Sequence, residues 1–228
     1  MIVPPTTTTS PISSVTELGR FISSIPPSST LYLDLEGYKL GRSGNIAIIT
    51  VPFIHKWWLG SSTSRHSNNT AFISEAHNGK SLKSILEDRE TPKCLWDVRN
   101  DADALWALYQ VRLAGVTDVQ LLENASRAGD KTYVHGLDKC IQSDLKLGFM
   151  ALNRWIRTKQ EIRTSMPTGI FNTRPLDSKT VQYCINDVVY LPDLYASYMK
   201  RIESDWLAKA MDESERRVVE ALSAGSEP

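Results

Sequence analysis

The chain has 228 residues, of which 41% are hydrophobic and 23% are charged, a composition typical of a globular protein with a sizeable core. Its 26 Lys and Arg residues balance 26 Asp and Glu residues, so the formal net charge is zero. This balance argues against a protein that binds nucleic acid mainly through an overall basic surface.

Cysteine use and hydropathy indicate where the chain resides. Cys94, Cys140 and Cys184 are odd in number and far apart, so neither disulfides nor structural zinc is expected, and a reducing compartment is the simplest interpretation. No apolar run approaches the roughly 20 residues of a transmembrane helix, and the N-terminus lacks the features of a secretory signal. We expect an intracellular protein, nuclear or cytoplasmic, that is not secreted and has no membrane partner.

The first quarter of the chain predicts a tail, a helix and a group of strands. Residues 1–13 are rich in Pro, Thr and Ser and are expected to form a disordered tail, whereas 15–23 carry apolar residues at helical spacing after two serines. In 31–40, LYLDLEGYKL, leucines alternate with polar residues as in a strand. The turn sequence GRSG leads into 45–53, rich in Ile and Val, which favours an antiparallel hairpin followed by a third strand at 55–59.

The remaining segments are mostly helical in pattern. A polar stretch at 60–70 is expected to be a loop, 94–98 a short strand, and 151–172 has a mixed pattern. Helices are expected at 81–86, 102–113, 118–127, 136–147, 178–190 and 193–223. Strands first, then strands alternating with helices, indicate an α/β fold with a mixed central sheet, an antiparallel hairpin and helices on both faces. One domain over 14–205 is sufficient, with a C-terminal helix and tail at 206–228.

Two acidic residues share one face of the first expected strand. Because successive strand side chains point to opposite faces, Asp34 and Glu36 project together while the neighbouring leucines point away. Neighbouring carboxylates repel one another unless a cation intervenes, and a hard divalent ion such as Mg²⁺ or Mn²⁺ suits an all-oxygen cluster. A solvated strand face is the more common origin of such a pattern, so the pair alone does not establish a site.

The segment YCIND contains a second same-face pair. Tyr183 and Asp187 lie four residues apart, so a helix stacks the phenol and the carboxylate on one side. Apolar residues cluster on the opposite side, which gives this helix one face to pack and one polar face. An exposed polar face is again the more common outcome for a single helix.

A third acidic region lies at a junction between strand and helix. In KCLWDVRNDADALW, residues 93–106, spacing alone does not choose among Asp97, Asp101 and Asp103. Asp101 stands near the start of the expected helix, where a carboxylate can also serve as a cap.

Taken in order, the three segments resemble the motifs of the DEDD superfamily of 3′→5′ exonucleases, and within it the RNase D-like branch with a tyrosine in the last motif (DEDDy). The motifs are LYLDLEG, KCLWDVRNDADAL and YCINDVVYL. The family's acid in the second motif precedes a helix leucine by four residues, which selects Asp101 ahead of Leu105. RPL before the last motif and GVTDVQLLE after the second are also similar to this branch, and to its fungal members.

Two further positions bear on the resemblance. Gln182 stands five residues before the last acid, where the other main branch has a histidine, and this supports the tyrosine branch. Trp96 stands where many relatives carry a histidine. That position is not one of the metal-binding acids, but the change affects the expected contacts with the substrate.

The resemblance implies a ribonuclease H-like fold and a two-metal-ion 3′→5′ exonuclease that releases nucleoside 5′-monophosphates. The cofactors would be two divalent ions, Mg²⁺ or Mn²⁺, and the partner a nucleic acid with a free 3′ end, RNA being favoured over DNA. Asp34 would bridge both ions, Glu36 and Asp187 would complete one site, and Asp101 would help hold the other. Tyr183 would orient the attacking water, because a phenol is a poor general base near neutral pH.

Two other interpretations remain open. Some proteins of this fold have lost catalysis and act as RNA-binding or scaffolding modules, although such members usually lack one of the acids, and all five expected residues are present here. The chain could also be a proofreading domain cut from a longer polymerase or helicase.

Several other residues are weaker candidates. Trp57 and Trp58 lie in an expected strand, where core packing is favoured over base stacking, and the four histidines form no ligand-spaced pattern. Asp97, Asp103 and Asp118 are expected to be solvated or capping acids. A local basic excess in the second half either touches phosphates or forms a solvated face. Its members are Lys139, Arg154, Arg157, Lys159, Arg163, Arg174 and Lys179.

Overall fold

The computed structural model describes residues 12–51, 56–59 and 65–223. Its strands are β1 (Leu31–Tyr32), β2 (Asp34–Glu36), β3 (Ile48–Val51), β4 (Lys56–Leu59), β5 (Lys93–Leu95) and β6 (Val116–Asp118). Within the described residues they form two three-stranded sheets. Strands β1, β5 and β6 pair in parallel in that order, and β2, β3 and β4 pair antiparallel in chain order.

Leu33 joins the two sheets into one mixed layer. It lies between β1 and β2, and its N–H donates to the carbonyl of Cys94 in β5 with an N···O distance of 2.9 Å. The same extended segment pairs in parallel with β5 at Tyr32 and antiparallel with β3 at Asp34. This arrangement confirms the expected mixed sheet, its antiparallel hairpin and, in β4, the third strand.

The hairpin is shorter than its sequence pattern suggests. β2 ends at Glu36 rather than near residue 40, because the turn begins at Gly37. A Cβ atom at Gly37 would lie 1.8 Å from the carbonyl oxygen of Asn45, so this close approach of two backbone segments requires glycine. The side chain of Asn45 closes the turn by accepting from the N–H of Tyr38 at 2.8 Å.

Ten helices surround this layer in the part of the chain that the structure describes. They are α1 (Val15–Ser24), α2 (Arg65–Ile73), α3 (Leu82–Glu87), α4 (Arg99–Tyr109), α5 (Val119–Ser126), α6 (Leu137–Asp144), α7 (Phe149–Ser165), α8 (Ser178–Val189), α9 (Leu191–Met199) and α10 (Ser204–Ser223). Two 3-10 turns, Met166–Thr168 and Ile170–Asn172, follow α7 and complete the segment whose pattern was mixed.

Several assignments from the sequence were wrong or shifted. The helix expected over 193–223 is divided into α9 and α10 by residues 200–203, which are not helical. The loop expected at 60–70 contains the start of α2, which the fully buried Phe72 anchors in the core despite the polar sequence. Strand β6 was not predicted, because it is only three residues long and is followed directly by α5, whose N-cap is Asp118. The helix expected at 102–113 runs from Arg99 to Tyr109, since Gln110 adopts a left-handed conformation with φ 53°.

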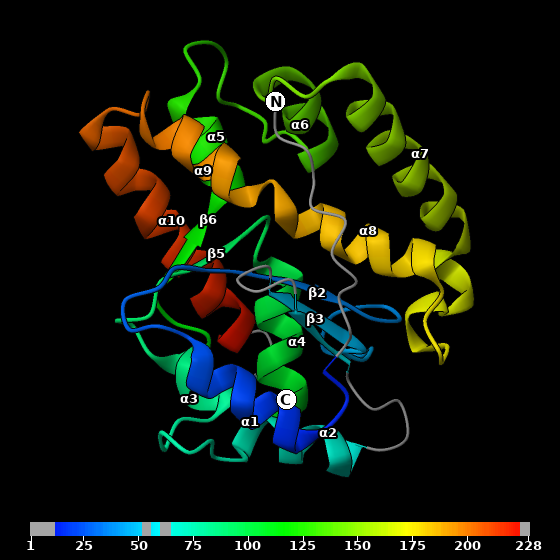
Figure 1. Ribbon diagram of the computed structural model, residues 1–228. Coiled ribbons are helices and arrows are strands. Elements are labelled where there is room, and N and C mark those ends of the chain that lie inside the picture. The colour runs from blue at the N-terminus through cyan, green and yellow to red at the C-terminus, as the bar shows by residue number, and fades with distance from the viewer. Residues whose placement is uncertain (1–11, 52–55, 60–64, 224–228) are drawn as a thin grey trace.

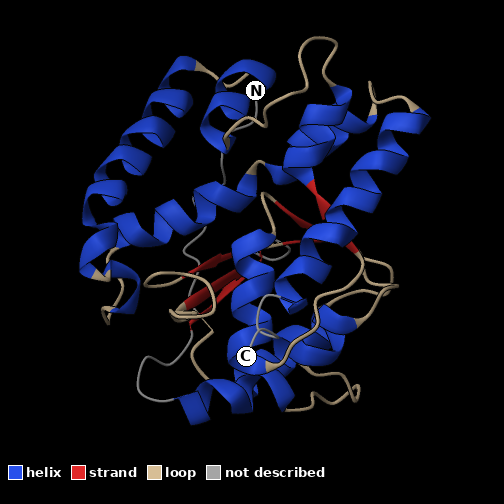
Figure 2. Cartoon of the chain, turned by 180° about the vertical axis from the view of Figure 1, so that it is seen from behind, coloured by secondary structure: helices blue, strands red, loops and turns tan. Residues whose placement is uncertain are grey.

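Helices cover both faces of the strand layer, as Figures 1 and 2 show from opposite sides. Leu31, Leu33 and Leu35 point into a first core with α1, α3 and α4. On the opposite face, Cys94 belongs to a second core with α5, α6, α8 and α9. Ile12 is 3% exposed and packs in the first core. The disordered tail expected at 1–13 is therefore wrong at its C-terminal end, and residues 1–11 lie outside the described residues.

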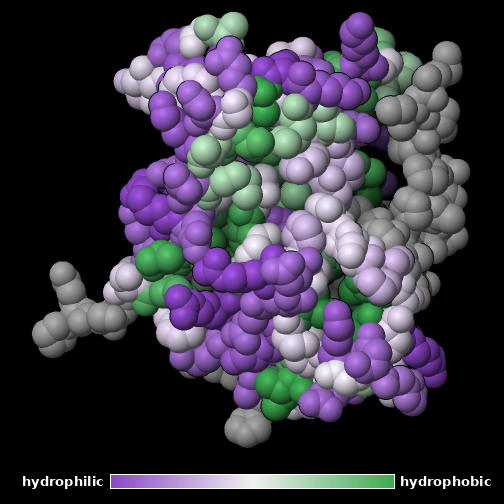
Figure 3. Space-filling view, turned by 90° about the vertical axis from the view of Figure 1, so that its left-hand side faces the viewer, coloured by the Kyte–Doolittle hydropathy of each residue, from purple (hydrophilic) through white to green (hydrophobic). Residues whose placement is uncertain are grey.

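The C-terminal helix α10 packs on the same body. Val218 and Ala221 belong to the first core, and α10 lies against α4, α5 and β6. The side of the molecule that faces the viewer in Figure 3 is mainly hydrophilic, with small separate hydrophobic areas. None of the described helices is both long and apolar enough to cross a membrane.

Candidate active site

Strand β2 supplies two carboxylates to one face of the sheet. Leu33 and Leu35 are 2% and 3% exposed in the first core, whereas Asp34 and Glu36 are half-buried and point to the opposite face. Both acids are fixed in position by the pairing of β2 with β3. The Oδ2 atom of Asp34 is buried and has no hydrogen-bond partner among the described residues. The expected same-face pair is present.

Helix α8 brings the second pair of residues over this face. Asp177 caps α8 by accepting from the N–H groups of two residues in its first turn, and the helix crosses β2 and β3 (Figure 1). Tyr183 and Asp187 stand one turn apart on its inner side and are 5% and 7% exposed. The polar side of α8 is therefore buried, although an exposed polar face is the more common outcome for such a helix.

Helix α4 supplies the fourth carboxylate. Asp101 lies in its first turn, is 6% exposed and does not cap the helix, since the N-cap residue is Val98 and has no side-chain cap. Burial and the charge of Asp34 raise the pKa of Asp101, whereas the backbone of Leu35 in β2 lowers it, so Asp101 lies next to β2. The Oδ1 atom of Asp101 is buried without a partner in the described part of the chain.

The four acids form one electrostatic unit, although they are not equally close. One oxygen each from Asp34, Glu36 and Asp187 lie within 4.8 Å of one another, whereas Asp101 is outside this group. Burial raises the pKa of Asp34, Glu36 and Asp101. Repulsion adds to burial, because Asp187 raises the pKa of Asp34, and Asp34 raises the pKa of the other two.

The phenol of Tyr183 stays protonated in this surrounding. Burial raises its pKa above the ordinary value, and the charges of Asp187, Glu36 and Asp34 raise it further. Tyr183 stands one helical turn from Asp187 in α8, and its ring lies 5.9 Å from that of Phe171. A buried phenol held in this way can donate a hydrogen bond and orient a small molecule, but it is not a proton acceptor near neutral pH.

A cation that the sequence did not single out also enters this group. The Nζ atom of Lys159 in α7 lies 2.8 Å from Oδ1 of Asp187, and the two side chains are 11% and 8% exposed. In the sequence Lys159 is one of many basic residues in the second half. Its proximity to Asp187 depends on how α7 packs on α8, for which the sequence carries no local signal.

The donor set fits a hard divalent cation. All four candidate ligands are carboxylates, the oxygen donors that Mg²⁺ and Mn²⁺ prefer. Buried oxygens without hydrogen-bond partners, as found in Asp34 and Asp101, are costly in a folded protein, and a bound cation removes that cost. The carboxylate group could therefore hold a divalent metal ion.

The other acids near these motifs have structural roles. Asp118 caps α5 as expected, but it is fully buried rather than solvated. Asp97 forms an ion pair with Arg99. Asp103 accepts from the backbone N–H of Arg42 at 2.7 Å and pairs with the Arg42 guanidinium, which fastens α4 to the hairpin turn. These contacts leave Asp101 as the acid of this region that faces β2.

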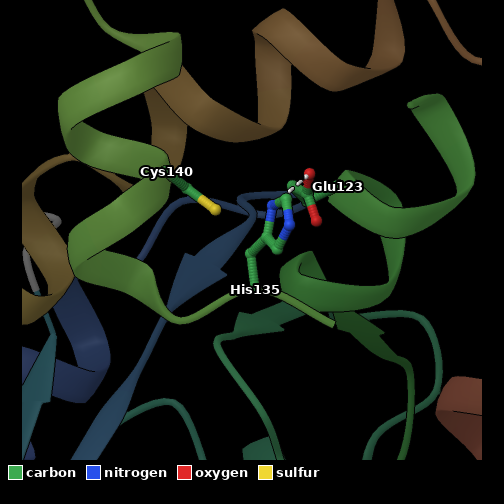
Figure 4. A group of neighbouring side chains, drawn as sticks. All are labelled: Glu123, His135 and Cys140. Carbon is green, nitrogen blue, oxygen red and sulfur yellow. Dashed lines mark ion pairs between the residues drawn. The ribbon is translucent and has the colours of Figure 1, made fainter. Parts of the chain in front are cut away.

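A second group of metal-ligating residues lies in α5, α6 and the segment between them. Glu123, His135 and Cys140 point toward one another (Figure 4), with one ligand atom each within 4.8 Å of the others. The sequence spacing of the histidines did not predict this group. Arg127 already holds Glu123, with 2.9 Å from Nε to Oε1, and Lys139 lies 2.8 Å from Nε2 of His135. Arg127 therefore neutralises the one carboxylate of this group, Lys139 occupies a ring nitrogen of His135, and we assign no metal to it.

The remaining sequence candidates are not part of the carboxylate site. Trp96 is half-buried against the second core, so its ring has a packing role. The side chains of Trp57 and Trp58 lie outside the described residues. Lys179 pairs with Glu161 at the surface, at 2.7 Å, which favours a solvated face for this basic residue.

Three comparisons with known proteins bear on the fold and the family. Among solved structures, the chain is similar to Trypanosoma brucei RNase D in its GMP complex, with 17% identity over 93% of this chain and 64% of that one, and a TM-score of 0.71. It is similar to Escherichia coli RNase D, an exoribonuclease involved in structured RNA processing, with 20% identity, coverage of 95% and 51%, and a TM-score of 0.67. It also resembles Brucella melitensis NrnC bound to pGG, with 16% identity, coverage of 86% and 85%, and a TM-score of 0.61.

At these identities the likeness concerns the fold, which is the ribonuclease H-like fold of 3′-5′ exonucleases. The chain spans about two thirds of the T. brucei RNase D chain and about half of the E. coli one. None of the curated proteins matches the chain by sequence. A family model described as 3′-5′ exonuclease matches residues 11–203, a range that contains all five candidate residues and ends just before α10. The chain therefore belongs to the 3′-5′ exonuclease family, with an RNase D-like fold.

Proposed function

We propose that the protein is a two-metal-ion 3′→5′ exonuclease that hydrolyses phosphodiester bonds at the 3′ end of a nucleic acid. The observation that carries the proposal is the group of Asp34, Glu36 and Asp187, whose carboxylates converge within 4.8 Å beside Tyr183. Membership in the 3′-5′ exonuclease family, whose DEDD members use divalent ions, supports this assignment. The exonuclease domain would occupy 14–205, and assignment to the tyrosine branch and its fungal members remains a prediction.

Each candidate residue has a role that its surroundings support. Asp34, Glu36, Asp101 and Asp187 would hold two divalent ions, Mg²⁺ or Mn²⁺, because their charges act on one another in one small, buried region. When bound, such ions supply Lewis acidity to the scissile phosphate and lower the pKa of the attacking water. The Tyr183 hydroxyl would orient that water and retain its own proton, because burial and the neighbouring carboxylates raise its pKa. The product would be a nucleoside 5′-monophosphate.

RNA is the favoured substrate over DNA. Support comes from the solved structures: T. brucei RNase D holds GMP, NrnC holds pGG, and E. coli RNase D is an exoribonuclease. The carboxylates would contact phosphate oxygens through metal and read no base, so the choice of sugar would depend on contacts to the 2′-hydroxyl. All three cysteines are free and buried, in keeping with the expected reducing compartment, nuclear or cytoplasmic.

Side-by-side digestion tests this function. Single-stranded RNA, single-stranded DNA and duplexes with 3′ overhangs, each labelled at the 5′ end, are incubated with Mg²⁺ or Mn²⁺ and with EDTA. The proposal expects stepwise shortening from the 3′ end, release of nucleoside monophosphates, faster loss of RNA, and no reaction in EDTA. Tight RNA binding that is indifferent to metal and gives no shortening would instead identify a non-catalytic RNA-binding module.

A further inference from the structure

Lys159 is the one basic residue that contacts the carboxylate group within the described part of the chain, and it does so from a separate helix. α7 packs along α8, and the Lys159 ammonium reaches across to Oδ1 of Asp187 at 2.8 Å. Both side chains are about nine-tenths buried, at 11% and 8% exposure. Because a buried charge is costly unless it is paired, each of these two side chains depends on the other.

Two aromatic rings enclose the ammonium on its other sides. The Nζ atom of Lys159 lies 5.0 Å from the ring centroid of Trp155 and 5.7 Å from that of Tyr183. Both distances suit cation–π attraction. Trp155 is itself fixed, because its indole N–H donates to the carbonyl of Asn186 in α8 at 3.3 Å. The site for this cation is therefore built from α7 and α8 together.

The charge of Lys159 acts on more than one carboxylate. It lowers the pKa of Asp34 and that of Glu36, in each case against the larger effect of burial. Its ammonium thus supplies positive charge in the same small volume that a divalent ion would need. An ammonium within a few ångströms of such an ion repels it, and it also occupies an oxygen of a candidate ligand.

We propose that Lys159 is an internal counter-ion that holds the acidic cluster together in the metal-free enzyme and competes with a divalent ion for Asp187. Lys159 is a positioning residue in this account: it acts through Asp187. This role rests on the proposed metal site, and through it Lys159 sets the affinity of that site for a divalent ion. Metal binding releases the Lys159 ammonium from Asp187, and the divalent ion then replaces it as the positive charge next to this carboxylate.

Metal binding and thermal unfolding of Lys159→Met test this proposal without any measurement of activity. Mn²⁺ titration by calorimetry should show that the variant binds the first ion about tenfold more tightly than the wild type or better, because the competing charge is gone. In EDTA the variant should unfold at a lower temperature than the wild type, and Mn²⁺ should raise its unfolding temperature by more. If Lys159→Met does not fold, Lys159→Gln, which keeps a hydrogen-bond donor for Asp187, carries the same expectations.

Two variants serve as controls. Lys179→Met removes a lysine from α8 whose ion pair with Glu161 is exposed, with the lysine side chain 67% exposed, and it should change neither quantity. Lys159→Arg keeps the charge and should keep the Mn²⁺ affinity of the wild type. Unchanged or weaker Mn²⁺ binding in Lys159→Met, with normal binding in the wild type, would overturn the counter-ion role alone. A wild-type protein that binds no Mn²⁺ would overturn the proposed function and this inference with it.

Discussion

Arg217 of α10 donates a hydrogen bond to Asp118 at the end of β6, with 2.7 Å between Nη1 and Oδ2, and the two side chains are 8% and 0% exposed. Asp118 in turn accepts from the backbone N–H groups of Asp97 and Val98, which precede α4. One buried carboxylate thereby links the C-terminal helix to the start of the helix that carries Asp101. The position of Asp101 thus depends on a helix beyond the residues that the family model matches.

Arg217→Met should lower the free energy of unfolding by about 3–5 kcal/mol, because it leaves the charge of Asp118 buried and unpaired. Urea unfolding followed by circular dichroism measures this loss. Arg216→Met is the matched control: this neighbouring arginine is 58% exposed and pairs with Glu213 and Glu220 on the same helix. Equal losses in the two variants would contradict the role given to the buried pair.

Asp101→Asn should affect metal binding and activity, whereas Asp103→Asn, only two residues away, should affect stability. Asp101 faces β2 with an unpartnered oxygen, so its loss should weaken binding of one divalent ion and reduce exonuclease activity at least 100-fold, as expected for a lost charge-stabilising contact. Asp103 is held by Arg42 in the hairpin turn, so its loss should lower stability and leave metal binding unchanged. Mn²⁺ titration and thermal unfolding of both variants distinguish these effects. Loss of metal binding in Asp103→Asn alone would reverse the assignment.

Tyr183→Phe should lower kcat by about 100-fold or more, in the range of a lost water-orienting contact, while metal affinity stays within about twofold. The fold should persist, because the ring that packs near Phe171 is retained. Tyr190→Phe is the control, since Tyr190 is also buried on this part of the chain but belongs to the second core. Steady-state kinetics and Mn²⁺ binding are compared for both variants. A Tyr183→Phe enzyme with normal kcat would remove the hydroxyl from the mechanism.

Lys93 should make the free energy of unfolding depend on pH in the alkaline range, independently of the active site. Its side chain is fully buried, donating to the carbonyl of Ile85 at 3.1 Å, and burial lowers its pKa from 10.5 to about 8. Between these two values the unfolded chain binds more protons than the folded one, so stability rises as pH increases from about 8 to 10.5. Relative to Lys93→Met, the wild type should gain up to about 3 kcal/mol over this window. Urea unfolding at several pH values checks it, and a constant difference between the two proteins would refute it.

The residues of the site were predictable from the sequence to different degrees. Asp34 and Glu36 follow from strand alternation, and Tyr183 with Asp187 from helical spacing, because these patterns are local. Asp101 required the family resemblance, since three acids surround one junction and only contacts with β2 distinguish it.

Features that depend on distant packing could not be predicted. Lys159 reaches Asp187 only because α7 lies along α8, and no spacing in the sequence encodes that contact. The Glu123–His135 pair likewise forms between a helix and the segment after it. In the fold, β6 escaped because three residues carry too little pattern, and α2 because Phe72 stabilises a helix whose sequence is polar.

The activity of the Asp34→Asn variant tests most directly the central claim that the carboxylate group is the active site of an exonuclease. Asp34→Asn keeps the size of the side chain in β2 but removes a carboxylate of the candidate metal site whose Oδ2 atom is buried without a partner in the described part of the chain. We expect wild-type protein with Mg²⁺ or Mn²⁺ to shorten a 5′-labelled RNA from its 3′ end, and Asp34→Asn to be at least 1,000-fold slower, on the order of a lost metal ligand, while unfolding cooperatively. Equal degradation of the RNA by Asp34→Asn and wild type would contradict the assignment of this site.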